Sequence, residues 1–351
     1  KTTIAVSNVS QRICRSMGYD TIVVGMGAAG VTAASTLARA GSRVLGLEAD
    51  NRIGGRVKTV PFGDGVVEVG AECLRLKCNC NNHKTDNLQN KYNNGPGLPT
   101  LDIKLNKEVT QIKWPKDSTG DVEVVCADGE RFTTDNVIVT ISLGVLKERH
   151  TDMFLPSLPK EKVDLINSMS IGVLGKIILE FEIPWWNDSP FTSLIFMWRS
   201  EDRKKVSIED LWITKIFGCS ILKAVLLISA QVETLPEEVV TKKTMELLRR
   251  FMGKQFSIPE PKRTLVTKWH SNPYTRGSYT YDNLLTPQQS HARTVLAQPL
   301  LDASGRARVL FAGEATNQTH FSTVHGASET GYREAMRILN IKNLQKKYIS
   351  P

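Results

Sequence analysis

One stretch, residues 19–56, constrains the fold of this chain more than any other. A short apolar run leads into Gly25-x-Gly27-x-x-Gly30, an alanine-rich helical pattern follows, and a second apolar run ends in Glu48. Strand, glycine-rich turn, helix, strand and terminal acid in this order predict a dinucleotide-binding βαβ unit. A glycine motif alone also occurs in ordinary turns, but the complete arrangement favours the nucleotide interpretation.

Each residue of this unit has its own expected task. Gly25 permits the tight turn, Gly27 lets a pyrophosphate approach the backbone, and Gly30 lets helix and strand pack closely. The helix then directs its N-terminus at phosphate charge. Glu48 lies 18 residues (48 − 30) past Gly30, where an acid binds a ribose hydroxyl and disfavours the 2′-phosphate of NADP. The candidate nucleotide-binding residues are therefore Gly25, Gly27, Ala29, Gly30 and Glu48.

The residues that follow favour a flavin over a nicotinamide. The chain continues from Glu48 through Arg52 to Gly54-Gly55-Arg56. The second glycine pair allows another close approach to the backbone, and Arg56 offers a guanidinium to phosphate or ribose oxygens. This ExxxRxGGR arrangement resembles the FAD-binding start of the flavin amine oxidases. We therefore expect FAD as the cofactor and Arg56 among the residues that bind it.

Composition excludes several other classes of protein. The 351 residues suffice for two domains or one large one, and 41% hydrophobic and 23% charged residues are ordinary for a globular chain. The net charge of +9 is scattered, without an RNA-binding motif, so no nucleic-acid partner is expected. No apolar run has membrane-spanning length. Six cysteines in a chain of this size slightly favour the cytoplasm, while a secreted or peroxisomal location stays open.

Residues 57–72 predict two short strands that end in Gly70-Ala71-Glu72. A similar Gly-Ala pair lies beside the flavin in the amine oxidases, which makes Gly70 and Ala71 candidate cofactor residues. In those enzymes an aromatic-rich segment with a channel histidine usually follows. Here the sequence continues with Cys73-Leu-Arg-Leu-Lys instead.

The segment 73–100 is rich in Asn and Lys and poor in hydrophobic residues, which predicts a polar linker. Cys78, Cys80 and His83 within it raise a zinc hypothesis. The one-residue cysteine spacing and the lack of a second ligand pair favour accidental crowding, so no metal site is expected. In the amine oxidases a long, largely helical part of the substrate domain occupies this place.

From residue 101 the pattern returns to strands. Residues 105–112 and 122–125 flank a hairpin signal, and residues 137–141 predict a buried strand. This meander resembles the return of the amine oxidase chain into its FAD domain. The resemblance implies that Val109 meets the adenine through its backbone, although an ordinary strand valine would explain the side chain equally well.

Lys176 opens an apolar strand that follows a helix predicted at 156–169. On physical grounds alone this lysine is expected to point to solvent, because Lys is rarely buried without a partner. The resemblance implies another role. In polyamine and monoamine oxidases a lysine that opens a similar KIxLxF strand holds a water at the reactive N5 of the flavin. Lys176 is therefore the candidate catalytic residue.

A third resemblance lies in residues 269–281. They read Trp269-His-Ser-Asn-Pro-Tyr-Thr-Arg-Gly277-Ser-Tyr279-Thr-Tyr, which is similar to the W-x-S-N-P-x-x-x-G-S-Y-x-Y of animal polyamine oxidases. Trp269 and Tyr279 are accordingly candidates to border the flavin or the amine. Each aromatic residue taken alone belongs more often to a core than to a site.

The C-terminal block is the most specific. An apolar strand runs into Gly313-Glu314-Ala-Thr, and Phe-Ser-Thr323-Val324-His325 then opens a helix to about residue 339. If the pyrimidine edge of the flavin lies before this helix, the free N–H groups of its first turn stabilise negative charge on the reduced flavin. GEATxxxxFSTxHGA resembles the polyamine oxidases, which makes Gly313, Glu314, Thr323 and Val324 candidate cofactor residues. His325 is interpreted as a helix-start residue more readily than as a substrate ligand.

Together these resemblances imply a two-domain α/β flavoprotein, with a Rossmann-like FAD-binding domain and a substrate domain of mixed sheet and helices. The expected domains are a discontinuous FAD-binding domain at 18–72, 101–150 and 262–346, a polar linker at 73–100, and the remaining substrate-binding domain at 151–261.

The implied activity is FAD-dependent oxidation of spermine, spermidine or their acetylated forms. Hydride would pass from the amine to the flavin, and molecular oxygen would then be reduced to hydrogen peroxide. The partners are a small cationic amine and oxygen, and the oligomeric state stays open. Two alternatives remain: a truncated FAD-binding protein without oxidase activity, and a flavin oxidase of another amine or an amino acid.

Overall fold

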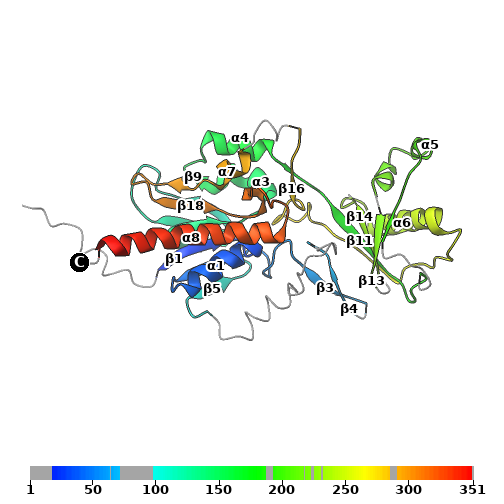
Figure 1. The fold of residues 1–351 in the computed structure, drawn as a ribbon, viewed down its shortest axis with the longest axis horizontal. Helices are drawn as coiled ribbons and strands as arrows, with labels where there is room; N and C mark the ends of the chain where they lie inside the picture. Colours follow the sequence, from blue (N-terminus) through cyan, green and yellow to red (C-terminus); the bar gives the residue numbers. More distant parts are fainter. Residues whose placement is uncertain are drawn as a thin grey trace, which may run out of the picture.

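The computed structural model describes residues 18–63, 65–71, 98–186, 193–216, 218–222, 225–230, 232–284 and 291–349. They form two regions arranged end to end (Figure 1). One region is built on a nine-stranded sheet and the other on a five-stranded sheet. Residues 73–97, with the Cys78, Cys80 and His83 of the zinc hypothesis, lie outside the described residues.

A parallel core forms the centre of the nine-stranded sheet. Its strands come from three separate parts of the chain and lie in the order β5-β2-β1-β8-β18. Their bounds are β5 (Leu101–Lys104), β2 (Val44–Leu47), β1 (Tyr19–Val24), β8 (Arg131–Val139) and β18 (Ala307–Phe311). This parallel sheet with helices confirms the predicted α/β fold.

Helices cover both faces of this core because successive strand residues point to opposite sides. Val23 packs in the cluster of α1 (Ala28–Arg39) and α8 (Val324–Ile349). Its neighbours Ile22 and Val24 face the cluster formed by α3 (Leu143–Met153), α4 (Lys160–Ser168) and α7 (Ala292–Ala297). The nucleotide-binding turn between β1 and α1 therefore rests on a fully buried sheet.

The two long helices on the first face, α1 and α8, approach each other closely. A Cβ on Gly331 of α8 would lie 2.1 Å from the carbonyl oxygen of Ala29 in α1. Ala33 and Ala34 are fully buried in α1, and Ala335 is fully buried in α8. Small residues on both helices therefore allow the N-terminal and C-terminal segments of the chain to pack against one sheet face.

A branch leaves the sheet at β8 and differs in part from the prediction. It begins with the antiparallel strands β7 (Val122–Cys126) and β6 (Val109–Lys113), and the short β9 (Phe154–Leu155) pairs with β6 in parallel. At the other end, β17 (Leu300–Leu301) pairs antiparallel with β18. The start of the strand predicted at 105–112 is wrong: the strand begins at Val109, because the chain turns at Asn106 (φ 55°) between β5 and β6. The helix predicted at 156–169 begins later, at Lys160, with Pro159 at its N-cap.

The five-stranded sheet has the order β12-β13-β14-β11-β15. Their bounds are β12 (Ser193–Ile195), β13 (Gly218–Leu222), β14 (Val225–Ala230), β11 (Gly175–Glu180) and β15 (Arg263–Val266), and every pair is antiparallel. The amphipathic α6 (Glu237–Met252) packs on one face through Val240, Leu247 and Leu248. The short α5 (Ser200–Arg203) and the 3-10 helix η2 (Leu211–Lys215) complete this region.

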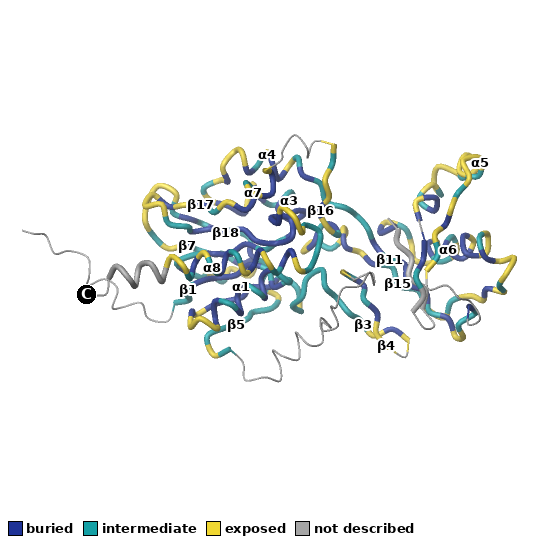
Figure 2. Tube along the Cα trace, in the orientation of Figure 1, coloured by how far each residue is buried: buried dark blue, intermediate teal, exposed yellow. Residues whose placement is uncertain are grey.

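Two small sheets lie between the regions: the hairpin β3 (Thr59–Phe62)–β4 (Gly65–Glu68) and the pair β10 (Ser170–Ile171)–β16 (Thr280–Tyr281). The hairpin packs on the five-stranded sheet through a cluster that contains Phe62, Ile178 and Trp269. Figure 2 shows continuous burial along the central strands of the larger sheet. Among the helices that the structure describes, none is long and apolar enough to cross a membrane.

Candidate functional site

The glycine turn between β1 and α1 leaves room for a ligand at one position and none at another. Gly25 has φ of +89°, a left-handed conformation that favours glycine. A Cβ on Gly30 would lie 1.9 Å from the Gly25 carbonyl oxygen, so Gly30 packs directly against the turn. Among the described residues, a Cβ on Gly27 would meet no atom closer than the Gly54 oxygen, at 4.0 Å. The backbone at Gly27 is therefore open to a close approach.

The N-terminus of α1 has no negative group of its own. Gly27 occupies the N-cap position without a capping side chain, and the first turn, which contains the buried Ala29, holds no acid. Its N–H groups and the positive end of the helix dipole are thus available to an anion. By contrast, α6 carries Glu237 and Glu238 in its first turn.

Glu48 stands directly after β2, on the same side of the sheet as the turn. The side chain is 7% exposed, and its two oxygens accept the N–H groups of Met26 at 2.7 Å and Asp50 at 2.9 Å. Burial raises the pKa of the Glu48 carboxyl, although these two bonds act against the shift. Each carboxylate oxygen has a second lone pair, so a ribose hydroxyl can also bind.

The segment that leads to Val109 returns to the same place. The Lys107 N–H donates to the carbonyl oxygen of Glu48 at 2.8 Å, two residues before Val109 begins β6. Val109 itself is buried and pairs with Cys126. The structure therefore brings the backbone of Val109 to the end of the sheet where Glu48 lies.

The second glycine pair forms a tight turn against the first. Gly54 and Gly55 have φ of +107° and +56°, and the Gly54 N–H donates to the Met26 carbonyl oxygen at 2.8 Å. The Arg52 guanidinium donates to the carbonyl oxygens of Gly55 at 2.6 Å and Ile53 at 3.0 Å. Arg52 thus stabilises the shape of this turn through the backbone.

Arg56 joins the two ends of the chain. Its Nη1 donates to Glu314 Oε1 at 3.0 Å, across 258 residues of sequence, and to the Ser278 carbonyl oxygen at 2.9 Å. The structure therefore pairs this guanidinium with a carboxylate of the C-terminal block. The phosphate or ribose contact expected from the sequence stays a prediction for its remaining N–H groups.

Glu314 is the buried acid of this contact and opens the 3-10 helix η4 (Glu314–Thr316) after Gly313, which has φ of +118°. Its Oε2 accepts the Thr280 hydroxyl at 2.6 Å and the Ser322 N–H at 2.9 Å. Burial would raise the pKa of Glu314, but the charge of Arg56 and these bonds outweigh it and hold the pKa below the ordinary value. Glu314 is therefore an ionised carboxylate that organises the protein around it.

The N-terminus of α8 follows this acid closely. Ser322 has φ of +63°, and α8 begins at Val324 without an acid in its first turn. The Thr323 hydroxyl accepts the Gly326 N–H at 3.0 Å, and its Oγ1 lies 3.4 Å from Nε2 of His325. Like α1, α8 thus has no acid within its first turn, and its N–H groups before Gly326 remain for a neighbouring anion beside the Glu314 carboxylate.

Lys176 approaches from the five-stranded sheet. Its Nζ donates to the carbonyl oxygen of Glu68 at 2.8 Å. Gly70 lies two residues after Glu68, and a Cβ on it would lie 2.1 Å from the Arg56 carbonyl oxygen. The same oxygen accepts the Ala71 N–H at 3.0 Å. The structure therefore brings Lys176, Gly70, Ala71 and Arg56 to one extended segment.

Trp269 contacts the same segment, but from the interior. It is 6% exposed, and its indole N–H donates to the Val69 carbonyl oxygen at 3.1 Å. Tyr279 lies farther along the chain and is 39% exposed, and partial burial raises the pKa of its phenol. Trp269 thus packs beneath residues 68–71, and a ligand contact for either aromatic residue stays a prediction.

The structure adds polar residues that sequence reasoning missed. Glu233 accepts the N–H groups of His270 at 2.8 Å and Ser271 at 2.8 Å, and so holds the turn after Trp269. Arg293 is 3% exposed and joins α7 to the surroundings of Glu314. Neither lies in a recognisable motif.

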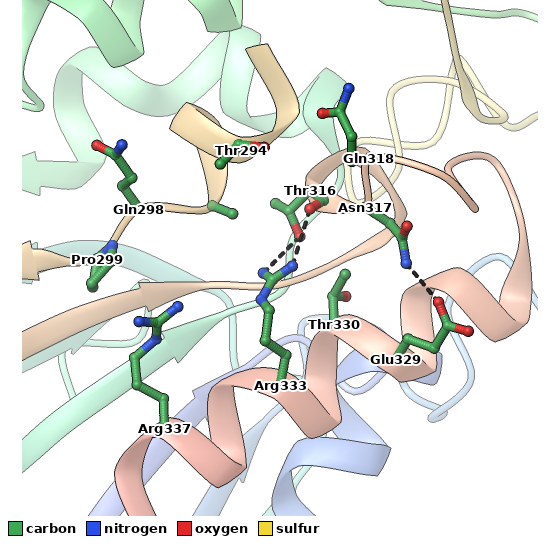
Figure 3. Close-up of a pocket in the computed structure, with 11 residues that line it drawn as sticks. Thr294, Gln298, Pro299, Thr316, Asn317, Gln318, Glu329, Thr330, Arg333 and Arg337 are labelled. Carbon is green, nitrogen blue, oxygen red and sulfur yellow. Dashed lines mark hydrogen bonds between the residues drawn. The ribbon is translucent and has the colours of Figure 1, made fainter. Parts of the chain in front are cut away.

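A pocket of about 380 Å³ lies behind this site, between α7, residues 316–318 and α8 (Figure 3). Arg333 extends toward Thr316 at its floor and donates to the carbonyl oxygens of Thr316 at 3.1 Å and Phe311 at 2.9 Å. None of the predicted cofactor residues lines it. Arg333 therefore anchors the body of α8 to η4 and β18.

The comparisons with known proteins decide the family. The sequence profile of the family described as flavin containing amine oxidoreductase matches residues 28–84 and 85–339. The chain belongs to this family. Membership confirms the resemblance to the flavin amine oxidases and makes FAD the cofactor.

Curated relatives match over most of this chain but only part of their own. The human peroxisomal N(1)-acetyl-spermine/spermidine oxidase is 36% identical over 312 residues, which are 81% of this chain and 58% of that protein. The histone demethylase-like protein A of Aspergillus fumigatus is 36% identical over 264 residues, 69% of this chain and 23% of that protein. The chain thus spans little more than half the length of the acetylpolyamine oxidases that it matches.

Solved structures agree on the fold. Putrescine oxidase bound to putrescine superimposes with a TM-score of 0.68 and covers 92% of this chain and 99% of its own, at 16% identity. At this identity the likeness supports the flavoenzyme fold alone.

The residues present fit FAD. The open backbone at Gly27 and the acid-free first turn of α1 suit a pyrophosphate, and Glu48 keeps acceptor sites for a ribose. The acid-free first turn of α8 suits an electron-rich ring edge. Two helix N-termini and one carboxylate therefore match the charge pattern of the cofactor.

Proposed function

We propose that this chain catalyses the FAD-dependent oxidation of a polyamine, with acetylated spermine and spermidine as the first candidates. The contact that carries the proposal is the one between Lys176 and the Glu68 carbonyl oxygen, beside Gly70 and Ala71. It holds a cation against the segment that lies beside the flavin in related enzymes. The 36% identity to the human acetylpolyamine oxidase over 312 residues supports this substrate class.

The residues of the chain bind and orient the reactants. Gly27, Glu48 and the N-terminus of α8 hold the cofactor, and Lys176 orients a water near the reacting atoms. The substrate must lose its ammonium proton before it can be oxidised, and the partly buried ring of Tyr279, which is 39% exposed, favours the neutral amine. Bound FAD would supply the two-electron oxidation of the amine carbon, with molecular oxygen as the final acceptor and hydrogen peroxide as the product.

A second candidate is an FAD-binding protein without oxidase activity. The observation that favours it is length, because the chain spans 58% of the human relative. A surface shaped by so much less chain can bind the cofactor and still lack contacts that orient an amine. Oxidation of another amine, such as a methylated lysine, is the third outcome, since a histone demethylase-like relative is also 36% identical, over 69% of this chain.

The test is peroxide release from purified, FAD-loaded protein, with flavin content measured in the same sample. We expect peroxide from N1-acetylspermine, N1-acetylspermidine, spermine or spermidine. Loaded protein that forms none with these amines contradicts polyamine oxidation and favours the second candidate. Activity confined to a methyl-lysine peptide supports the third.

Lys176→Met sharpens the role of the lysine. It preserves the length of the side chain but removes the ammonium group, so we expect flavin reduction or reoxidation to slow about tenfold while FAD stays bound. Lys243→Met is the matched control, because Lys243 pairs with Asp210 on the outside of α6. Stopped-flow rates that change equally in both variants would remove Lys176 from the site.

A further inference from the structure

We propose that Arg293, a buried arginine of α7, is a positioning residue that sets the N-terminus of α8 against the flavin. The inference rests on the proposed placement of the pyrimidine edge of the flavin at that N-terminus. Arg293 lies at 3% exposure, although Arg is rarely buried unless it is paired. Its surroundings explain the burial.

One guanidinium contacts four residues from three parts of the chain. Nη1 donates to the Thr280 hydroxyl oxygen at 3.0 Å and to the Ala315 carbonyl oxygen at 3.3 Å, while Nη2 donates to Asp282 Oδ1 at 2.8 Å. The guanidinium carbon also lies 3.8 Å from the centre of the Phe321 ring, within cation–π range. Arg293 therefore ties β16 and η4 to the residue that precedes Ser322.

These contacts fix the direction of a hydrogen-bond relay. A guanidinium has only donors, so the Thr280 oxygen must accept from Arg293. The single hydroxyl proton of Thr280 is then directed to Glu314 Oε2, at 2.6 Å. Arg293, Thr280 and Glu314 thus form a relay with one possible orientation, which ends on the buried carboxylate.

The relay supports a strained turn. Ser322 has φ of +63°, a conformation that costs a residue with a side chain on the order of 1 kcal/mol unless its surroundings impose it. Glu314 Oε2 accepts the Ser322 N–H at 2.9 Å, and the Thr280 carbonyl oxygen accepts its hydroxyl. Phe321, immediately before it, stacks on Arg293. Arg293 therefore acts on both residues that turn the chain into α8.

The consequence is confined to the first turn of α8. The body of the helix is anchored separately by Arg333, whose guanidinium donates to η4 and β18 (Figure 3). Val324, two residues past Ser322, begins the helix, and its N–H group has no intrahelical partner. Weakening the relay should move these free N–H groups without loosening the rest of α8, and so reduce stabilisation of the more negative, reduced flavin.

The test compares Arg293→Lys with Arg308→Lys. Arg308 is a matched control, because it is 4% exposed and bonds to Asp302 at 2.7 Å and to the Asp135 carbonyl oxygen at 2.8 Å, away from the relay. We expect Arg293→Lys to weaken binding of reduced FAD about tenfold more than that of oxidised FAD. For a two-electron couple this lowers the flavin potential by about 30 mV. Arg308→Lys should leave the potential unchanged even if both variants melt at lower temperature.

The outcomes separate the inference from the proposed function. Equal potentials in wild type and Arg293→Lys would overturn the positioning role and leave the proposed function standing. Wild-type protein that binds no FAD would overturn both. If Arg293→Lys does not fold, the isosteric Thr280→Val removes the same relay, and a potential unchanged in that variant overturns the inference equally.

Discussion

The two regions of this molecule treat the charge at their helix ends differently. In the five-stranded region α6 begins with Glu237 and Glu238 and ends with Arg249 and Arg250, so its dipole is balanced by its own sequence. In the nine-stranded region α1 and α8 begin without an acid. The arrangement of α6 is complete in the protein alone, whereas the first turns of α1 and α8 are left open to an anionic ligand.

The regions also differ in what holds them together. The five-stranded region relies on an apolar core with aromatic contacts, such as that of Trp185 with Trp186, whose ring centres lie 4.9 Å apart. The nine-stranded region, called the cofactor side below because it carries the proposed FAD site, adds buried ion pairs that join distant segments, as Arg56 and Glu314 do. Such pairs contribute little net stability but require a precise geometry, which a binding site needs. The difference is consistent with cofactor binding on one side and packing on the other.

The largest expected effects separate the two glycines of the turn. Gly30→Ala places a methyl group 1.9 Å from a backbone oxygen, so we expect insoluble or unfolded protein. Gly27→Ala meets no described atom within less than 4.0 Å and should fold normally, but bind FAD at least about 100-fold more weakly, because the methyl group occupies the approach to the pyrophosphate. Circular dichroism and flavin titration measure the two effects, and unchanged FAD affinity in Gly27→Ala would refute its role.

The buried ion pairs of the cofactor side should make it acid-sensitive. Burial alone would raise the pKa of Asp302, but bonds from Ser304, Arg306 and Arg308 outweigh it and hold the pKa well below its ordinary value of 3.8. An acid with a depressed pKa stabilises the fold above that ordinary value and loses its contribution as the pH falls below it. Asp302→Asn should therefore lower the unfolding free energy by about 3 kcal/mol at pH 7.

The difference in unfolding free energy between wild type and Asp302→Asn should narrow below about pH 4, because wild type then loses the contribution that the variant lacks. Denaturant titrations at pH 7, 5 and 3 measure it. A gap that stays constant across this range would show that the Asp302 charge is not its source.

A change in the other region should leave the cofactor side intact. Leu248 of α6 is fully buried in the apolar core of the five-stranded region. Leu248→Ala should lower the unfolding free energy by about 3 kcal/mol through a cavity, while FAD affinity stays within about twofold of wild type. A larger loss of FAD affinity in thermal and flavin titrations would mean that the two regions do not act separately.

The smallest expected effect concerns Glu48. Glu48→Gln keeps the shape of the side chain and one acceptor oxygen but removes the charge, so we expect FAD to bind about tenfold more weakly. Its NH2 group faces one of the two buried N–H donors, of Met26 or Asp50, so the unfolding free energy should fall by about 1 kcal/mol. Fluorescence quenching on FAD titration measures the affinity. Glu209→Gln, at an exposed residue between α5 and η2 of the five-stranded region, is a control for loss of an acid in general.

The sequence predicted best what depends on nearby residues. Gly25 to Glu48 form one local unit, and its strands and helix lie where the pattern indicated. The separation of β5 from β6 was missed, because the decisive turn at Asn106 carries no glycine or proline. Partners in space could not be predicted either. Nothing near Arg56 in the sequence marks Glu314, and nothing near Arg293 marks Thr280 or Phe321.

We propose that a chain spanning little more than half the length of its acetylpolyamine oxidase relatives still contains a complete FAD site. The most direct test of this claim is a comparison of FAD and FMN binding to the purified chain by equilibrium dialysis. FMN lacks the pyrophosphate and the adenosine that the α1 N-terminus and Glu48 are proposed to bind. We predict one FAD per chain, bound at least about 100-fold more tightly than FMN. Equal affinities, or no retained FAD, would contradict the claim.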